Sequence, residues 1–272
     1  MICILGSDSF SFYLACKLQE TNQEVFVLST KSEAKKHSIT IKEEGKFQKK
    51  QYEIDVKHHL DVEPDFLIIS CPKELLKTEI IALRKSLLIN TPTICLSGLK
   101  DAKLINELLN KNIELGYFEG GFNKKNDFIN VNGLGAILYL TSDCSFLEVL
   151  KKTDLKVETK ENQEILFWKW FSIFSITFIL NCLYKKSVFE LSKNKDYREL
   201  IEKLVNEISE TSPLKNNKSF EILSNITSIS NQTVYKFSFT EINFINNTLK
   251  ENLNEKNELN KLIKTIYKTH VL

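Results

Sequence analysis

MICILGSDSFSFYLACKLQETNQEVFVL (1–28) opens the chain with a strand, a tight turn, a helix and a second strand. The apolar run at 2–5 ends at Gly6, and residues 12–18 then carry apolar side chains at helical spacing. A second apolar run, at 24–28, follows a short polar stretch. Because a unit of this kind opens doubly wound α/β domains, the N-terminus predicts an α/β fold.

The same alternation of strand and helix continues along the chain. FLIIS (66–70) and TICL (93–96) are continuous apolar runs, and each precedes a stretch with helical spacing, at 73–86 and at 101–110. Strands that are apolar at every position are typical of parallel sheets covered on both faces. The sequence therefore predicts a parallel sheet with helices on both sides.

A strand-rich segment follows residue 113. Asn-Gly between two β-rich runs is a strong hairpin signal, and this segment contains one such pair. The expected strands are 113–118, 128–131 and 134–140, with turns at Gly120-Gly121 and Asn132-Gly133.

The last part of the chain is predicted to be helical. None of the 8 glycines lies beyond Gly135. A long apolar helix is expected at 164–190, with more polar helices at 196–210 and 239–268. A turn-rich part followed by a glycine-free part predicts two domains, an α/β domain at 1–160 and an all-α domain at 161–272.

Charge and hydropathy exclude several classes of function. The 272 residues carry a formal charge of +2, which gives no electrostatic basis for binding nucleic acid. The stretch ILFWKWFSIFSITFILNCL (165–183) approaches the length of a membrane span. Lys169 within it would be costly in a lone span, so we expect a buried helix and no membrane partner.

Cysteine usage points to a reducing compartment and away from metal binding. No two of the 6 cysteines form a CxxC pair, so neither a zinc motif nor a redox motif is indicated. The N-terminus has no basic region ahead of its short apolar run, and so does not resemble a signal peptide. A cytoplasmic protein without a metal site is the simplest interpretation.

The first turn is a candidate nucleotide site. A dinucleotide-binding turn has the pattern GxGxxG, in which the second glycine lets the diphosphate approach the backbone. This chain has Gly6, Ser7, Asp8, Ser9, Phe10 and Ser11, so that only the first glycine remains. Asp8 places a side chain and a negative charge where the second glycine would stand. The first five residues are candidates for cofactor binding; the alternative is a scaffold turn in which Asp8 or Ser9 caps the helix.

The end of the second strand bears on the choice of cofactor. NAD enzymes usually have Asp or Glu there to bind the ribose hydroxyls. This chain has Thr30 and Lys31, and a hydroxyl and an ammonium suit a 2′-phosphate. NADP is therefore favoured over NAD; the alternative is a solvated basic loop.

Five segments, in order along the chain, resemble the ketopantoate reductase (2-dehydropantoate 2-reductase) family. They are PDFLIISCPK (64–73), TICLSGL (93–99), LGYFEGGFNKKNDFINVNGLGAILYL (115–140), FWKW (167–170) and TEINFIN (240–246). The resemblance implies a Rossmann-like N-terminal domain and a C-terminal domain like that of 6-phosphogluconate dehydrogenase. It also implies NADPH-dependent reduction of ketopantoate to pantoate, a step of pantothenate and coenzyme A biosynthesis.

The resemblance carries site residues over, position by position. Lys169 matches the family's catalytic lysine and Glu241 its substrate-binding glutamate, and we group these two as catalytic. Lys73 and Ser97 match positions near the cofactor. The substrate candidates are Thr177, Asn181 and Ser228.

Two departures keep other functions open. Family members have asparagines one and two turns after the lysine, where this chain has Ile173 and Thr177. The alternatives are a reductase of another small 2-keto acid, and a diverged dinucleotide-fold protein that binds a metabolite without catalysis. For each of these, the partner is a small molecule, and a homodimer is the expected assembly.

Overall fold

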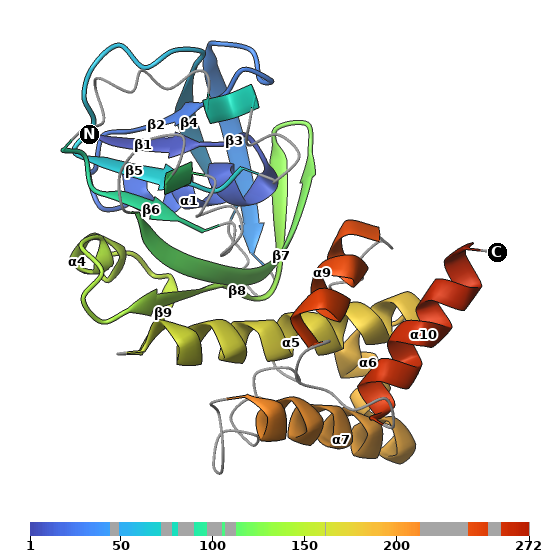
Figure 1. Cartoon of the computed structure of the whole chain (residues 1–272). Helices are drawn as coiled ribbons and strands as arrows, with labels where there is room; N and C mark the ends of the chain where they lie inside the picture. The colour runs from blue at the N-terminus through green and yellow to red at the C-terminus, as the bar shows by residue number, and fades with distance from the viewer. Residues whose placement is uncertain are drawn as a thin grey trace. The chain divides into compact units, whose positions relative to one another are not determined.

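A computed structural model describes residues 1–43, 49–71, 78–80, 90–96, 105–106, 113–160, 162–212, 239–249 and 257–271. The chain divides into two compact units (Figure 1). The first comprises Met1–Phe118, Phe122–Val131 and Gly135–Gln163. The second comprises Glu119–Gly121, Asn132–Leu134 and Glu164–Leu272.

A sheet with β1 near its centre organises the first unit. β1 pairs in parallel with both β2 and β5, as the apolar runs of the sequence predict. The sheet order is β3-β4-β2-β1-β5-β6-β7-β8-β9. The strands are β1 (Ile2–Leu5), β2 (Val25–Leu28), β3 (Lys36–Glu43), β4 (Lys50–Lys57), β5 (Phe66–Ile69), β6 (Thr93–Cys95), β7 (Glu114–Lys125), β8 (Phe128–Thr141) and β9 (Lys156–Lys160).

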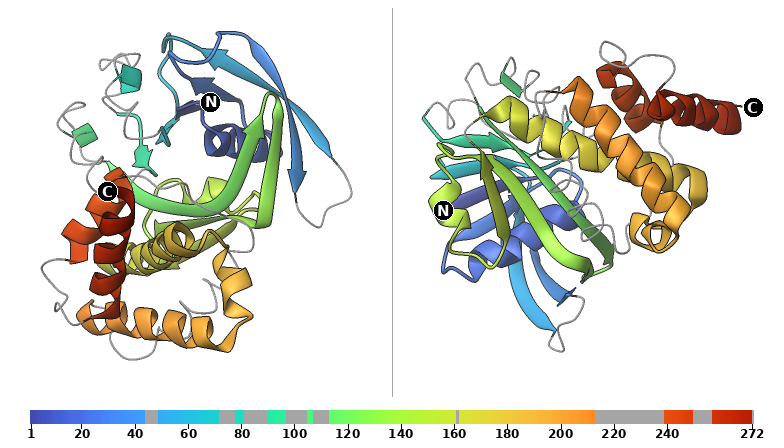
Figure 2. Two further views of the ribbon diagram at one scale, coloured as in Figure 1. Left: turned by 90° about the vertical axis from the view of Figure 1, so that its right-hand side faces the viewer. Right: turned by 90° about the horizontal axis from the view of Figure 1, so that it is seen from below.

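The sheet curves back on itself. β3 pairs with β8 in parallel over Thr40–Glu43 and Phe128–Val131, although these segments are far apart in the sequence. The curved sheet holds α1 (Ser9–Gln19) on its concave side (Figure 2). Nine of the eleven residues of α1 are buried, because strands pack against more than one side of the helix.

The buried amine of Lys17 ties α1 to distant segments. The side chain is 1% exposed, and its Nζ lies 2.7 Å from Glu43 Oε1 at the end of β3 and 3.0 Å from Asp154 Oδ1. Burial lowers the pKa of Lys17, but the hydrogen bonds and charges of Glu43 and Asp154 raise it by more. The net pKa lies above the ordinary value, so the cluster holds a charged amine.

The predicted turns at Gly120-Gly121 and Asn132-Gly133 are wrong, because β7 runs through the first pair. β8 continues through the second pair, and the turn between β7 and β8 lies at Asn126 and Asp127, where Asn126 has a φ of +54°. Gly116 marks a place of close packing inside β7. A Cβ at Gly116 would lie 2.7 Å from side-chain carbons of Leu140 and Leu96.

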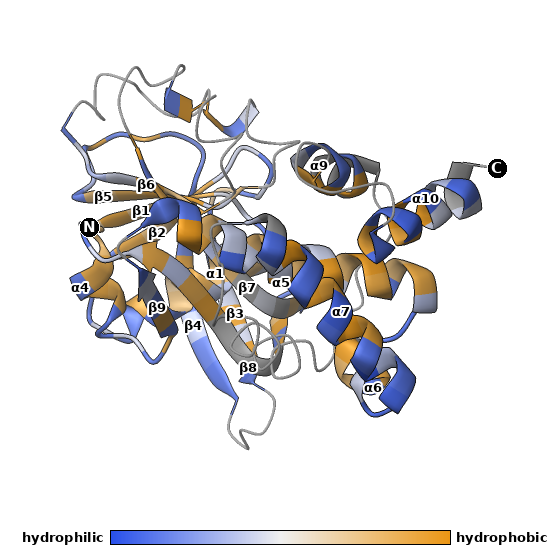
Figure 3. Ribbon diagram, turned by 60° about the horizontal axis from the view of Figure 1, so that its bottom comes forward, coloured by the Kyte–Doolittle hydropathy of each residue, from blue (hydrophilic) through white to orange (hydrophobic). Residues whose placement is uncertain are grey.

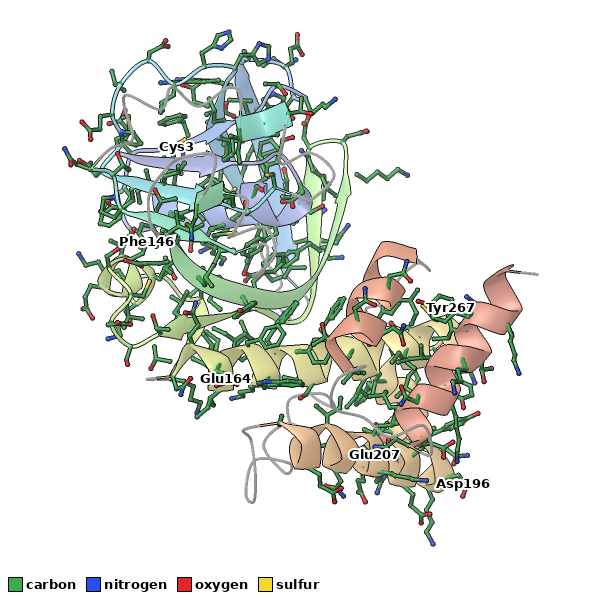
Figure 4. All side chains as sticks on the ribbon, in the orientation of Figure 1. Cys3, Phe146, Glu164, Asp196, Glu207 and Tyr267 are labelled. Carbon is green, nitrogen blue, oxygen red and sulfur yellow. The ribbon has the colours of Figure 1, made fainter. Side chains whose placement is uncertain are left out.

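Two apolar clusters cover the two faces of the sheet. One joins α1 to the inward side chains of several strands and includes Phe146. The other includes Cys3, Leu67 and Cys95 and is closed by Ile80 and Ile105. Figure 4 labels Cys3 and Phe146, one residue from each cluster. The arrangement confirms the predicted α/β class with a Rossmann-like sheet.

The second unit is helical, which confirms the expected all-α C-terminal part. Its helices are α5 (Gln163–Tyr184), α6 (Val188–Ser192), α7 (Lys195–Thr211), α9 (Phe239–Leu249) and α10 (Glu258–Val271); the first unit also contains α4 (Leu147–Leu150). Hydrophilic and hydrophobic residues alternate along α7 and α10 (Figure 3). Such a pattern is typical of helices with one face in a core.

The single helix expected at 164–190 is two helices. α5 ends at Tyr184, and Lys185 then takes a φ of +56°. The Asn181 side chain donates to the Lys186 carbonyl at 2.7 Å, which holds the turn. Ser187 then begins α6 with a reciprocal cap to Glu190.

α5 has the length and apolar composition of a membrane-spanning helix. In its most apolar window, however, 83% of the residues are buried inside the structure. The helix therefore has the burial of a core helix of a soluble protein.

Candidate functional site

The turn between β1 and α1 requires glycine at position 6. Gly6 has a φ of +132°, which side-chain-bearing residues rarely adopt. A Cβ there would lie 2.9 Å from both the Cα and the backbone nitrogen of Cys71. Glycine at position 6 therefore lets the turn after β1 pack against the residue that follows β5 by two positions.

Asp8 caps the helix that follows. It is the N-cap residue of α1, and its Oδ1 accepts from the Ser11 backbone nitrogen at 2.7 Å and from the Ser11 hydroxyl at 2.6 Å. Burial raises the pKa of Asp8, and the hydrogen bonds from Ser11 offset part of this rise. Of the two residues that could cap the helix, Asp8 does so, and Ser9 is the first helical residue.

Lys124 of β7 supplies a positive charge to this turn. Its charge lowers the pKa of Asp8, and the charge of Asp8 in turn raises that of Lys124. Burial has the larger effect on Lys124 and brings its pKa below the ordinary value. The amine lies 3.5 Å from the ring centroid of Phe12. Sequence reasoning missed Lys124, because nothing in one sequence shows that β7 passes α1.

Phe10 belongs to the core. Its side chain is 2% exposed and its ring stacks on Phe118 with centroids 3.6 Å apart. The Phe122 ring lies 5.4 Å away at a tilt. The geometry therefore gives Phe10 the role of packing α1 against β7, and nothing in it directs the ring toward a cofactor.

A buried carboxylate lies at the end of β2. Glu79 is 1% exposed, and it accepts from the Ser29 hydroxyl at 3.0 Å and from the Thr30 backbone nitrogen at 2.7 Å. The Ser29 hydroxyl also lies 2.9 Å from that of Ser7. Sequence reasoning placed no acidic residue here, because Glu79 comes from a different part of the chain.

Thr30 and Lys31 keep exposed side chains at this edge. The backbone nitrogen of Thr30 is taken by Glu79, and that of Lys31 donates to the Ser29 hydroxyl at 3.1 Å. The backbone nitrogens of both residues are therefore already bonded, whereas their side chains are exposed. Lys73, Ser97 and Ser228 lie outside the described residues.

The helical unit contains the expected lysine on α5. Lys169 is 1% exposed, Thr177 is 2% exposed and Asn181 is fully buried. Within the part of the chain that the structure describes, the Thr177 hydroxyl is buried without a hydrogen-bond partner. The Asn181 amide is used by the turn after α5, so its donor already has a structural role.

Glu241 lies on α9, in the same unit as Lys169. α9 is tied to α10 by a hydrogen bond from the Tyr267 hydroxyl to the Asn243 side chain. α10 is tied to α7, because Glu207 accepts from the backbone nitrogens of Glu258 and Leu259 at 2.9 and 3.0 Å. Figure 4 labels Glu207 and Tyr267 at these two links. Hydrogen bonds therefore fix the helix that carries Glu241.

Among the described residues, no group of three or more His, Cys, Asp or Glu side chains could hold a metal ion. The candidate chemistry rests on a glycine turn, hydroxyls and a buried lysine.

No protein-family profile and no curated protein sequence matches this chain. Many solved structures share its fold. D-mandelate dehydrogenase with NADH and anilino(oxo)acetate is 14% identical, with a TM-score of 0.75, over 100% of this chain and 99% of that one. The 2-dehydropantoate 2-reductase from Geobacter metallireducens is 13% identical, with a TM-score of 0.71, over 99% and 100%. A dimeric ketopantoate reductase from Staphylococcus aureus is 14% identical, with a TM-score of 0.71, over 98% and 97%.

Proposed function

We propose, from a fold shared along its whole length with ketopantoate reductases and D-mandelate dehydrogenase, that this chain is a nicotinamide-dependent reductase of a small 2-keto acid. The proposed reaction is reduction of 2-dehydropantoate to pantoate with NADPH. The observation that carries the proposal is Lys169, an amine held 1% exposed on the apolar helix α5.

Lys169 is the proposed general acid. Reduction of a ketone places negative charge on its oxygen, and an ammonium beside that oxygen stabilises the charge and delivers the proton. Glu241 on α9 is proposed to bind the substrate hydroxyl, and Ser228 to contact the substrate. The buried Thr177 hydroxyl is proposed to donate to the substrate carboxylate, which would satisfy a group that has no partner among the described residues.

The proposed cofactor is NADP(H), and the turn fits it only in part. Gly6 provides the close approach that the fold requires, and the exposed ammonium of Lys31 suits a 2′-phosphate. The Asp8 carboxylate, however, accepts from the Ser11 backbone nitrogen at the N-terminus of α1, where a diphosphate would lie. With Asp8 in this position the turn does not fit a diphosphate. Ser7, Ser9, Lys73 and Ser97 remain the other proposed cofactor contacts.

Turnover tests the proposal. Purified protein is mixed with NADPH and 2-dehydropantoate, and the absorbance of the reduced nicotinamide is followed. We expect turnover, and Lys169→Ala should lower kcat by about a hundredfold or more because it removes a general acid. Lys195→Ala, which removes an exposed lysine at the start of α7, is the matched control and should leave kcat unchanged.

Two outcomes separate the parts of the proposal. Turnover that survives Lys169→Ala would contradict the role of the lysine and leave the reaction standing. Turnover with a different 2-keto acid from a panel, but not with 2-dehydropantoate, would identify the protein as a reductase of that other acid.

A non-catalytic metabolite-binding protein is the second candidate, and Asp8 is the observation that favours it. Calorimetry with 2-dehydropantoate, compared with the turnover assay, distinguishes the two. The non-catalytic protein would bind the acid in the calorimeter but would not oxidise NADPH in the turnover assay. A cytoplasmic location and a homodimer complete the proposal. Light scattering would then give twice the chain mass of 31.5 kDa.

A further inference from the structure

Asp8 fills a position that an anionic ligand would otherwise take. In α1 it is the N-cap, and the nitrogen it accepts from, that of Ser11, is one of the donors left without a helical partner at a helix start. Dinucleotide folds offer such donors to the diphosphate. Here the donor is already satisfied, at 2.7 Å, by a carboxylate of the same turn.

The carboxylate is held by more than one hydrogen bond. The Ser11 hydroxyl donates to Asp8 Oδ1 at 2.6 Å, so its single hydrogen is used. The hydroxyl of Ser70, 2.8 Å from that of Ser11, must then donate to Ser11. The chain Ser70–Ser11–Asp8 links the end of β5 to the start of α1. Asp8 is therefore linked through Ser11 to the end of β5.

The Asp8 carboxylate has a basic side chain near it, as a bound anion would. Lys124 of β7 acts electrostatically on Asp8 and lowers its pKa. Glu79 adds a second buried carboxylate at the end of β2, where it takes the Thr30 nitrogen. A diphosphate entering here would meet a carboxylate and lose the N-terminal donor to it.

We propose that Asp8 is an internal competitor for the diphosphate, so that a dinucleotide binds this turn only by displacing the Asp8 carboxylate from Ser11. The proposal rests on the reductase function, and it assigns Asp8 as a residue that sets cofactor affinity. Gly6 lets the turn pack against the backbone of Cys71, and Asp8 accepts from the Ser11 backbone nitrogen at the start of α1.

The test compares NADPH binding by the full chain and its Asp8 variants, using fluorescence titration and calorimetry. Asp8→Asn keeps a good N-cap and removes the charge, and Asp8→Gly removes both the cap and the charge. We expect Asp8→Asn to bind NADPH about tenfold more tightly than wild type, because a like charge is gone, and Asp8→Gly to bind at least as tightly as Asp8→Asn.

Asp65→Asn is the matched control. It removes the same charge from an exposed side chain at the opposite end of the sheet, beside the N-terminal amine, and should leave the dissociation constant unchanged. Melting temperatures of all variants establish that each is folded.

The outcomes separate this proposal from the reductase function. Wild-type NADPH binding that neither Asp8 variant strengthens would overturn the role of Asp8 and leave the function intact. If neither wild type nor either variant binds NADPH, both proposals are wrong. Tighter binding by the variants without turnover of any 2-keto acid would support the role of Asp8 and contradict the reductase.

Discussion

Single residues explain why this turn has its shape. Gly6 has a positive φ that residues with side chains rarely adopt, and Asp8 is the N-cap of the helix that follows. The GxGxxG comparison predicted the need for the first glycine and the anomaly of Asp8. It could not predict that Lys124 acts on Asp8 or that Glu79 accepts from Thr30, because these residues are distant in the sequence and meet only in the folded chain.

Gly6→Ala should destabilise the first unit strongly. The added Cβ would lie 2.9 Å from backbone atoms of Cys71, and the φ of +132° would add strain, so we expect a loss of about 2–3 kcal/mol in the free energy of unfolding. Urea unfolding followed by circular dichroism measures it. Gly116→Ala is the control, since its Cβ would meet the ends of leucine side chains, which can move. An equal cost at both positions would contradict the argument.

At the scale of elements, the strands that sequence reasoning missed did carry a signal. β3 and β4 alternate buried and half-buried residues in their central part, with Ile39 and Ile41 buried on one strand and Ile54 and Val56 on the other. This period of two predicts half-buried strands, whereas no element was predicted for these residues. The Asn132-Gly133 prediction failed for a different reason, because Asn126 and Asp127 formed the turn instead.

Thr177 allows a structural role on α5 to be separated from a functional one. Its buried hydroxyl has no partner among the described residues, so Thr177→Val should leave the free energy of unfolding unchanged or raise it slightly. If the hydroxyl binds the substrate carboxylate, the same change should raise KM for the keto acid about tenfold with a smaller effect on kcat. Steady-state kinetics and urea unfolding on one preparation provide both readings. A loss of stability with unchanged KM would contradict the assignment.

At the scale of the whole molecule, the sequence predicted an α/β part followed by an all-α part, and the structure confirms both classes. The parallel order around β1 follows from the continuous apolar runs. The pairing of β3 with β8 could not be predicted, because a single sequence holds no information on which distant strands meet. The site residues stay predictions, with Lys169 and Gly6 the best supported by burial and backbone geometry.

The Lys17 cluster should make the first unit sensitive to alkaline pH. Its folded-state pKa lies above the ordinary value of 10.5, so its stabilising contribution is complete below that pH and is lost as the pH rises through the folded-state pKa. Lys17→Met should cost about 2–3 kcal/mol at neutral pH, because it removes the buried ammonium that pairs with Glu20, Glu43 and Asp154, while Asp154 is half solvated.

Urea unfolding of wild type and Lys17→Met at a series of pH values measures this contribution. The difference between the two proteins should shrink above about pH 10.5. A difference that stays constant into strong alkali would show that the amine contributes by packing alone.

Among the described residues, the β3–β8 pairing covers half of β3, the strand at one end of the sheet order. β8 pairs with β3 near its start and with β9 near its end. The last strand in the sheet order is β9, KVETK (156–160). β9 is only five residues long, three of them charged, and Lys156 pairs with Glu158 at 3.2 Å. Short, charged edge strands resist the strand addition that leads to aggregates. Curving the sheet around α1 thus also protects the protein against self-association through its backbone.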